Sequence, residues 1–165
     1  MSVRPILLYP DPILKQAAAP VSLDDPELKL LVQDMLDTLA ASPGVALAAP
    51  QIGRLAQVIV VDVTRKKGAS GHGLIVLLNP RVVQQDQPRL IREGCLSVPH
   101  YTGNVLRYGE TIVEGMTPEG QRLTLVTSGF EALAFQHEVD HLNGMLFLDR
   151  IQSLSSDLFR RKPKA

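Results

Sequence analysis

The spacing of apolar residues changes twice along the chain, and this order limits the fold more than any other feature of the sequence. Asp25 and Pro26 form a helix start, with a capping side chain followed by proline at the first helical position. Apolar residues then recur at helical spacing until Pro43-Gly44 ends the helix. They are Leu28, Leu31, Val32, Met35, Leu36 and Leu39.

After Gly53 the pattern becomes that of strands. Residues 57–63 and 74–78 are rich in Val, Ile and Leu, which indicates buried strands. We expect Asn79-Pro80 to stop the second of these strands, and residues 82–84 to be able to continue the same sheet.

Three further segments complete the predicted fold. Residues 111–116 and 122–127 flank Thr117-Pro118-Glu119-Gly120, which is a hairpin signature. A second helix is expected from about Phe130 to Leu142, and a last short helix over Ser153–Arg161. Helices and hairpins without crossover connections predict the α+β class, with antiparallel or mixed β-sheets packed around a central helix.

The composition limits the partners of the chain. Its 165 residues fit one domain, which we place over residues 1–165. The formal net charge is zero, so the chain as a whole shows no sign of affinity for DNA or a membrane. No apolar run approaches the ~20 residues that span a bilayer, and Met1–Pro5 does not begin a signal peptide. We therefore expect a cytoplasmic protein that binds neither DNA nor a membrane.

The predicted second helix carries a metal-binding pattern. Gln136–His141 contains His-Glu-x-x-His, and residues four apart on a helix share one face with Cβ atoms ~5–6 Å apart. Two imidazoles at that spacing can bind one metal ion. Glu138 lies farther around the helix, where it can reach a metal-bound water but is poorly placed as a ligand. The alternative is that His137 and His141 are merely tolerated on this face.

A catalytic site of this kind needs a third protein ligand. One metalloprotease pattern would supply a histidine at position 147, which is Phe147 here. The only cysteine of the chain, Cys95, is the natural candidate, because a thiolate is a strong ligand for zinc or ferrous iron. A lone cysteine is also compatible with a packed core residue.

At this point the sequence resembles the peptide deformylase family, which is marked by three motifs in a fixed order. Glu93-Gly94-Cys95-Leu96-Ser97 and Gln136–His141 match two of them in full. The first motif, Gly-x-Gly-x-Ala-Ala-x-Gln, appears as residues 44–51, with Ala46 in place of its second glycine. The resemblance extends from about Leu8 to Ile151.

The resemblance implies an activity and roles for particular residues. The family removes the formyl group from the N-terminal methionine of nascent polypeptides. By resemblance, Cys95, His137 and His141 hold one divalent metal ion, and Glu138 takes a proton from the attacking water and delivers it to the leaving amine. The side-chain amide of Gln51 and the backbone amide of Leu96 would stabilise the oxyanion.

The resemblance also implies a place for the substrate. A formylmethionyl peptide would lie extended beside Gly44, Val45 and Ala46, in a strand-addition mode. Position on the helix makes Phe130 and Leu133, with His137, candidates for the methionine pocket, with plain core packing as the alternative. Glu93 would support the metal site from behind, through Arg107, although a solvated surface pair is equally compatible with the sequence.

The sequence defines the identity of the metal ion less closely than it defines the ligands. Cysteine and two histidines suit zinc by geometry. The family is known for ferrous iron, with nickel, cobalt or zinc able to substitute, so Fe2+ is our first expectation.

Three other interpretations stay open at this stage. A zinc endopeptidase shares the helix motif but not the Cys95 motif. A metal-stabilised module without activity would need a fourth ligand, for which His72 or His100 could serve. An inactive family member is compatible with Ala46, although we expect an extended backbone there and an active enzyme.

A basic cluster, Arg160-Arg161-Lys162-Pro163-Lys164, lies near the C-terminus of a chain whose formal net charge is zero. This tail, residues 160–165, could hold the enzyme near the ribosomal exit, because RNA phosphates attract Lys and Arg. The alternative is a frayed, solvated terminus.

Overall fold

The computed structural model describes residues 2–162. Its sheet runs in the order β1-β2-β3-β4-β5, with β6 added to β4, and every pair of strands is antiparallel. The strands are β1 (Ala46–Ala48), β2 (Val58–Val61), β3 (Ile75–Cys95), β4 (Val98–Met116), β5 (Arg122–Ser128) and β6 (Leu158–Arg160). The α-helices are α1 (Leu28–Ala40), α2 (Gly129–Leu142) and α3 (Leu154–Asp157). Short 3-10 helices cover Pro12–Lys15, Ala49–Ile52, Val63–Arg65 and Phe147–Arg150.

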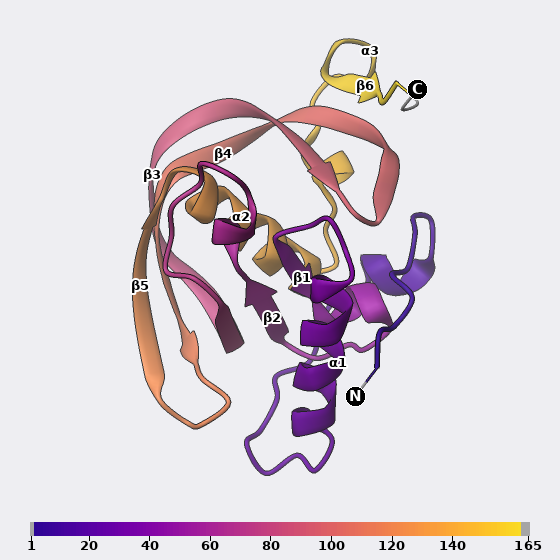
Figure 1. Cartoon of the computed structure of the whole chain (residues 1–165). Coiled ribbons are helices and arrows are strands. Elements are labelled where there is room, and N and C mark those ends of the chain that lie inside the picture. The colour runs from indigo at the N-terminus through magenta and orange to yellow at the C-terminus, as the bar shows by residue number, and fades with distance from the viewer. Residues whose placement is uncertain (1, 163–165) are drawn as a thin grey trace.

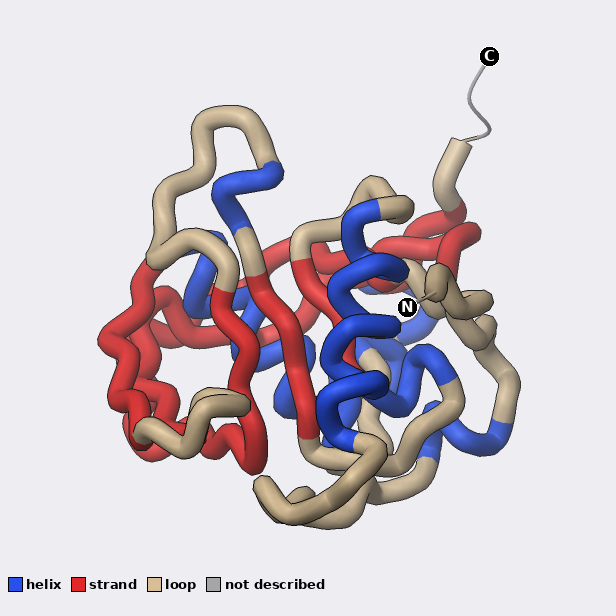
Figure 2. Tube along the Cα trace, turned by 60° about the horizontal axis from the view of Figure 1, so that its bottom comes forward, coloured by secondary structure: helices blue, strands red, loops and turns tan. Residues whose placement is uncertain are grey.

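Helix α2 lies at the centre of the molecule, as the α+β prediction required. It contacts β1, β2, β3, β4 and β5, and the strands curve around it (Figure 1). Helix α1 lies against β1 and β2 on their other face (Figure 2). Strands β1 and β2 therefore form a middle layer between helices α1 and α2.

Strand β2 shows why this layering works. Ile59 and Val61 join the apolar cluster under α2, whereas Val58 and Val60 join the cluster under α1. All four residues are fully buried, because a strand covered on both faces needs apolar side chains in both directions.

Helix α2 ends where the sequence predicted. The amide of Gly144 donates to the carbonyl of His141, and Gly144 takes the left-handed conformation, with φ of 72°. A residue in this conformation after the last turn is a common helix terminator, usually glycine.

Three predicted boundaries were wrong. Helix α1 begins at Leu28 rather than at Pro26: Asp25 accepts the amide of Glu27, as a capping side chain does, but residues 26–27 form a turn ahead of the helix. Strand β3 does not stop at Asn79-Pro80: it passes them with a register shift and a φ of 49° at Asn79. Ser153–Arg161 is a single helical turn, α3, followed by β6.

The largest omission from the sequence prediction is the arm formed by β3 and β4. These strands pair from Leu78 and Met116 out to Cys95 and Val98. The two residues between Cys95 and Val98 form the turn of this hairpin. Within residues 2–162, none of the helices has the length and apolar character needed to cross a membrane.

Candidate metal centre

Three ligand atoms from two elements converge beside α2. His137 and His141 lie one turn apart on the helix, and Cys95 is the last residue of β3 before the hairpin turn. His141 Nε2 lies 3.2 Å from His137 Nε2 and 3.4 Å from Cys95 Sγ. Ligands about 2.0–2.3 Å from a tetrahedral ion lie roughly 3.3–3.7 Å from one another, so these separations fit one bound metal ion.

The candidate fourth ligands lie elsewhere. Among residues 2–162, Cys95, His137 and His141 form the one group of His, Cys, Asp and Glu side chains close enough to share an ion. His72 instead bonds Glu131 through Nδ1 at 2.6 Å, and His100 is exposed at the edge of β4. A site with three ligands keeps a position open for water or substrate, which is the catalytic rather than the structural pattern.

Glu93 and Arg107 lie directly behind His137 and are both buried, so they are not a solvated surface pair. Arg107 donates through Nε and Nη2 to the two oxygens of Glu93, at 2.8 and 2.7 Å. Burial alone would raise the pKa of Glu93, but the charges of His137 and Arg107 outweigh it and lower that pKa to about 2. Glu93 therefore stays ionised beside the imidazole.

Glu138 faces the cluster from the same helix. Its Oε2 lies 3.9 Å from His137 Nε2, and the residue is 4% exposed. Oε1 is buried and has no hydrogen-bond partner among the described residues. Burial raises the pKa of Glu138 to about 7, a value suited to a group that must both accept and release a proton near neutrality.

Gln51 approaches the cluster from the 3-10 helix Ala49–Ile52. Its Oε1 accepts the amide of Ala48 at 2.9 Å, which turns the NH2 group toward the site. That group donates to Ser97 Oγ at 3.1 Å and lies 3.8 Å from Cys95 Sγ. Leu96 and Ser97 form the hairpin turn next to Cys95, so the backbone amide of Leu96 lies beside the same cluster.

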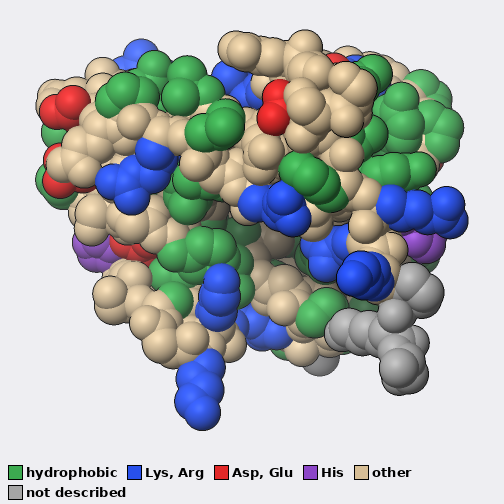
Figure 3. All heavy atoms as spheres, turned by 90° about the horizontal axis from the view of Figure 1, so that it is seen from above, with side chains coloured by type: hydrophobic (Ala, Val, Ile, Leu, Met, Phe, Trp, Pro, Cys, Tyr) green, Lys and Arg blue, Asp and Glu red, His purple; other side chains and the backbone are tan. Residues whose placement is uncertain are grey.

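A cavity of about 630 Å³ opens beside His137 and Glu138, whereas Cys95, His141 and Gln51 lie behind its lining residues. The predicted substrate residues Gly44, Val45, Ala46, Phe130 and Leu133 all line it, together with Leu96, Glu93, His137 and Glu138. In Figure 3 the face seen from above is hollowed near its centre, and Lys and Arg side chains gather around the hollow.

The backbone at Ala46 is extended, as expected. Ala46 is the first residue of β1 and pairs with Val61, so it needs no left-handed conformation. Its side chain is 8% exposed and belongs to the apolar cluster under α2.

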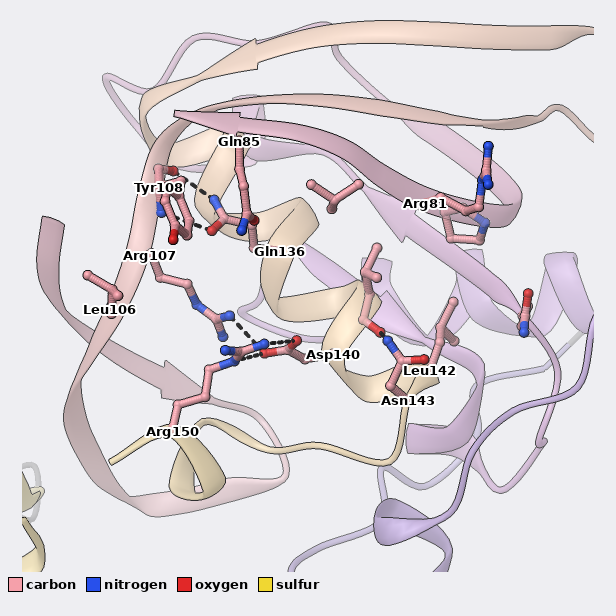
Figure 4. Close-up of a pocket in the computed structure, with 14 residues that line it drawn as sticks. Arg81, Gln85, Leu106, Arg107, Tyr108, Gln136, Asp140, Leu142, Asn143 and Arg150 are labelled. Carbon is pink, nitrogen blue, oxygen red and sulfur yellow. Dashed lines mark hydrogen bonds and ion pairs between the residues drawn. The ribbon is translucent and has the colours of Figure 1, made fainter. Parts of the chain in front are cut away.

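The region behind Arg107 contains polar residues that the sequence did not single out as functional. Arg107 Nη1 donates to Asp140 Oδ2 at 2.7 Å, and Arg150 Nη2 donates to Asp140 Oδ1 at 2.7 Å (Figure 4). Gln136 bonds the backbone of Tyr108 in the same region. Asp140 occupied only a variable position of His-Glu-x-x-His, Ser97 belonged to the cysteine motif without an expected role, and no pattern pointed to Arg150.

Comparison with known proteins gives one consistent result. The profile of the family described as polypeptide deformylase matches residues 3–157. A peptide deformylase of Syntrophobacter fumaroxidans is 44% identical over 99% of this chain and 95% of its own length. A crystal structure of a Legionella pneumophila peptide deformylase, 38% identical, superposes with a TM-score of 0.84 over 92% of this chain and 88% of that chain. A Met-Ala-Ser-bound peptide deformylase of Acinetobacter baumannii, also 38% identical, gives 0.83 over 90% and 98%.

Proposed function

The chain belongs to the polypeptide deformylase family, whose members remove the N-terminal formyl group from nascent polypeptides, and on this basis we propose how its own residues perform the reaction. It is an enzyme, a hydrolase of a metal-dependent family. The proposal concerns the metal, the residues that act on the formyl group, and the place where the enzyme works.

We propose that Cys95, His137 and His141 hold one divalent ion, with Fe2+ as the working metal and zinc, nickel or cobalt able to replace it. The spacing of the three ligand atoms and the soft thiolate support this assignment. When bound, such an ion lowers the pKa of a coordinated water toward ~7 and polarises the carbonyl of the substrate.

Glu138 moves the proton. Its unpartnered Oε1 is free to accept a hydrogen from the attacking water. The same carboxyl then delivers that proton to the amine nitrogen as the bond to the formyl carbon breaks. Formate and a peptide with a free N-terminal methionine are the products.

Gln51 and the backbone amide of Leu96 stabilise the charge that develops on the formyl oxygen. Gln51 suits this task because the amide of Ala48 fixes one end of its side chain and leaves the NH2 group facing the cluster. A donor that is already oriented does not have to be ordered during the reaction.

The peptide lies extended along Gly44, Val45 and Ala46, with its methionine side chain between Phe130 and Leu133. All five residues border the cavity that contains Glu138, which supports this placement. The relative from A. baumannii binds Met-Ala-Ser, a tripeptide with the free methionine that deformylation would leave.

The observation that carries the proposal is the convergence of three ligand atoms with one unpartnered carboxyl oxygen, beside a cavity that His137 and Glu138 line. The test measures formate release from formyl-Met-Ala-Ser, under low oxygen, by protein loaded with Fe2+, Zn2+, Ni2+ or Co2+. We expect release with each metal and the highest kcat/KM with iron. An unformylated peptide cleaved internally, without formate release, would instead indicate an endopeptidase.

We also propose that the enzyme works in the cytoplasm, where nascent formylated chains are made, and that its basic C-terminus attracts it to ribosomal RNA. Arg160 and Lys162 are exposed, which supports the second idea, and Pro163, Lys164 and Ala165 lie outside the described residues. Replacing Lys162 and Lys164 with glutamate should weaken salt-sensitive co-sedimentation with ribosomes. Unchanged co-sedimentation would remove this idea and leave the catalytic proposal intact.

A further inference from the structure

Three cationic side chains line the cavity in which the proposed reaction takes place. Lys66 follows the 3-10 helix Val63–Arg65, Arg92 lies on β3, and Arg161 directly follows β6. The three residues are far apart in the sequence, and only the fold brings them to one cavity. All three are exposed, so they border its outer part rather than its buried end.

Arg161 reaches the cavity because β6 is fixed to the sheet. Strand β6 pairs with Tyr101–Gly103 of β4, and the amide of Arg161 donates to the carbonyl of His100 at 2.8 Å. Its guanidinium then lies against Gly94, in space that a side chain at position 94 would otherwise occupy. Gly94 immediately precedes Cys95, and Arg161 lines the same cavity as His137, so its charge lies near the candidate metal centre.

Aromatic rings hold the other two cations. Arg92 lies over the ring of Phe159, 3.6 Å from its centre, and Lys66 lies 4.3 Å from the centre of the Phe130 ring. Such contacts restrain a cation without neutralising its charge. Phe130 itself borders the cavity, so Lys66 lies beside the proposed methionine pocket.

The cavity has little negative charge to offset these residues. Its two carboxylates are Glu93 and Glu138, and both are buried. Glu93 is already paired with Arg107 and His137. Among residues 2–162, neither Lys66, Arg92 nor Arg161 lies within 4.0 Å of a carboxylate oxygen, so each keeps an uncompensated charge.

We propose that Lys66, Arg92 and Arg161 make this enzyme selective for formylmethionyl chains with an acidic residue at the second or third position. The inference rests on the proposed function and adds a substrate preference to it. An acidic peptide is favoured over RNA as the partner because the three charges border the cavity shared with Glu138 and His137, which a peptide must enter. The effect should appear mainly in KM, since a side chain away from the reacting bond binds equally in the ground and transition states.

The test uses iron-loaded enzyme and C-terminally amidated formyl-Met peptides with Asp, Ala or Lys at position two or position three. At low salt we expect kcat/KM to favour Asp over Lys by about tenfold at one position or both, and the ratio to shrink at high salt. Arg161→Gln should lower that ratio about threefold, Arg161→Lys should restore it, and Arg161→Glu should bring it to about one or below. The matched control is Arg160→Gln, which alters the neighbouring exposed cation outside the cavity and should keep the wild-type ratio.

Equal kcat/KM for the Asp and Lys peptides in the wild type would overturn this inference. So would an Arg161→Gln ratio equal to that of the wild type. Inhibition by a short RNA, lost in Arg161→Gln while the peptides are not discriminated, would assign the cations to RNA instead. In all these cases formate release from the Ala peptide would leave the proposed function standing, whereas its absence would count against that function.

Discussion

Glu93 Oε2 accepts hydrogen bonds from both His137 Nδ1 and Arg107 Nη2, each at 2.7 Å. One carboxyl oxygen therefore fixes the protonated nitrogen of the imidazole and leaves Nε2 free to face Cys95 and His141. Carboxylates commonly orient metal-binding histidines in this way, and Arg107 keeps this one in place.

The first prediction concerns Arg107. Arg107→Met should lower the free energy of unfolding by about 3–5 kcal/mol, because it removes the buried guanidinium that Glu93 and Asp140 share and leaves Glu93 with His137 alone and Asp140 with Arg150 alone. Urea denaturation measures the change. Arg81→Met is the control: Arg81 is exposed and 3.9 Å from Glu114, and its loss should cost less than about 1 kcal/mol. Equal effects of the two substitutions would contradict the role of Arg107.

The second prediction separates Glu138 from the ligands. Glu138→Gln should retain the metal but lose about 10²–10⁴-fold in kcat, because the proton carrier is removed while the ligands remain. His137→Ala should lose the metal itself. Metal content and formate release, measured on the same samples, distinguish the two variants. A metal-free Glu138→Gln protein would assign Glu138 a structural role.

The third prediction concerns Cys95. The loaded protein should resist thiol reagents, and the chelated protein should react, because a ligated sulfur is unavailable as a nucleophile. The number of thiol-reagent molecules bound per chain reports on Cys95 alone, since Cys95 is the only cysteine in the sequence. Equal modification rates before and after chelation would argue against Cys95 as a ligand.

The fourth prediction concerns Ala46, where the family motif has glycine. Ala46→Gly should change kcat/KM by less than tenfold, since the extended backbone of β1 is open to either residue. It should cost about 0.5–1 kcal/mol of stability, because glycine is flexible in a strand. A hundredfold gain in kcat/KM would show instead that the methyl group obstructs the cavity.

The fifth prediction compares two glycines with positive φ. Gly144→Ala should destabilise the fold by more than about 3 kcal/mol, because the new methyl group would lie 2.7 Å from the carbonyl oxygen of Lys15. Gly68→Ala has a similar φ and open space around it, so it should cost only the ~1–2 kcal/mol of the conformation. The difference between the two melting curves isolates the collision. Equal costs would mean that the segment carrying Lys15 simply moves aside.

The sequence predicted the parts of the fold in which burial follows a period. Helix α1 and the hairpin of β4 and β5 were expected close to their observed positions, because each has one covered face. Helix α2 is buried on most of its surface, and its expected end came from Asn143-Gly144 rather than from a period of burial. The outer part of β3 was missed for the opposite reason. Residues 83–90 are all exposed, so no apolar alternation marks them as a strand.

The site divides in the same way. The ligands, Glu138 and Gln51 are recognisable because motifs keep them at fixed spacing. Asp140, Arg150 and Arg161 have no such local signal, because their roles depend on which strands pair. Arg161 illustrates this limit, because its position beside Gly94 follows from the pairing of β6 with β4. A strand of only three residues is too short for its sequence pattern to predict that pairing.

Strand β2 has a further consequence. A one-residue slip normally turns apolar side chains toward water, which penalises wrong registers. Here a slip would turn these side chains from one covered face to the other, since Val58, Ile59, Val60 and Val61 are buried on both faces alike. The register of β2 must therefore be fixed by other contacts, and those of Asn79 can fix it. Its side chain both donates to and accepts from the backbone of Val21. Its backbone amide donates to the carbonyl of Gln57, just before β2. Asn79 thus joins two segments at the start of β2, Val21 through its side chain and Gln57 through its backbone, and holds one alignment of the four apolar residues.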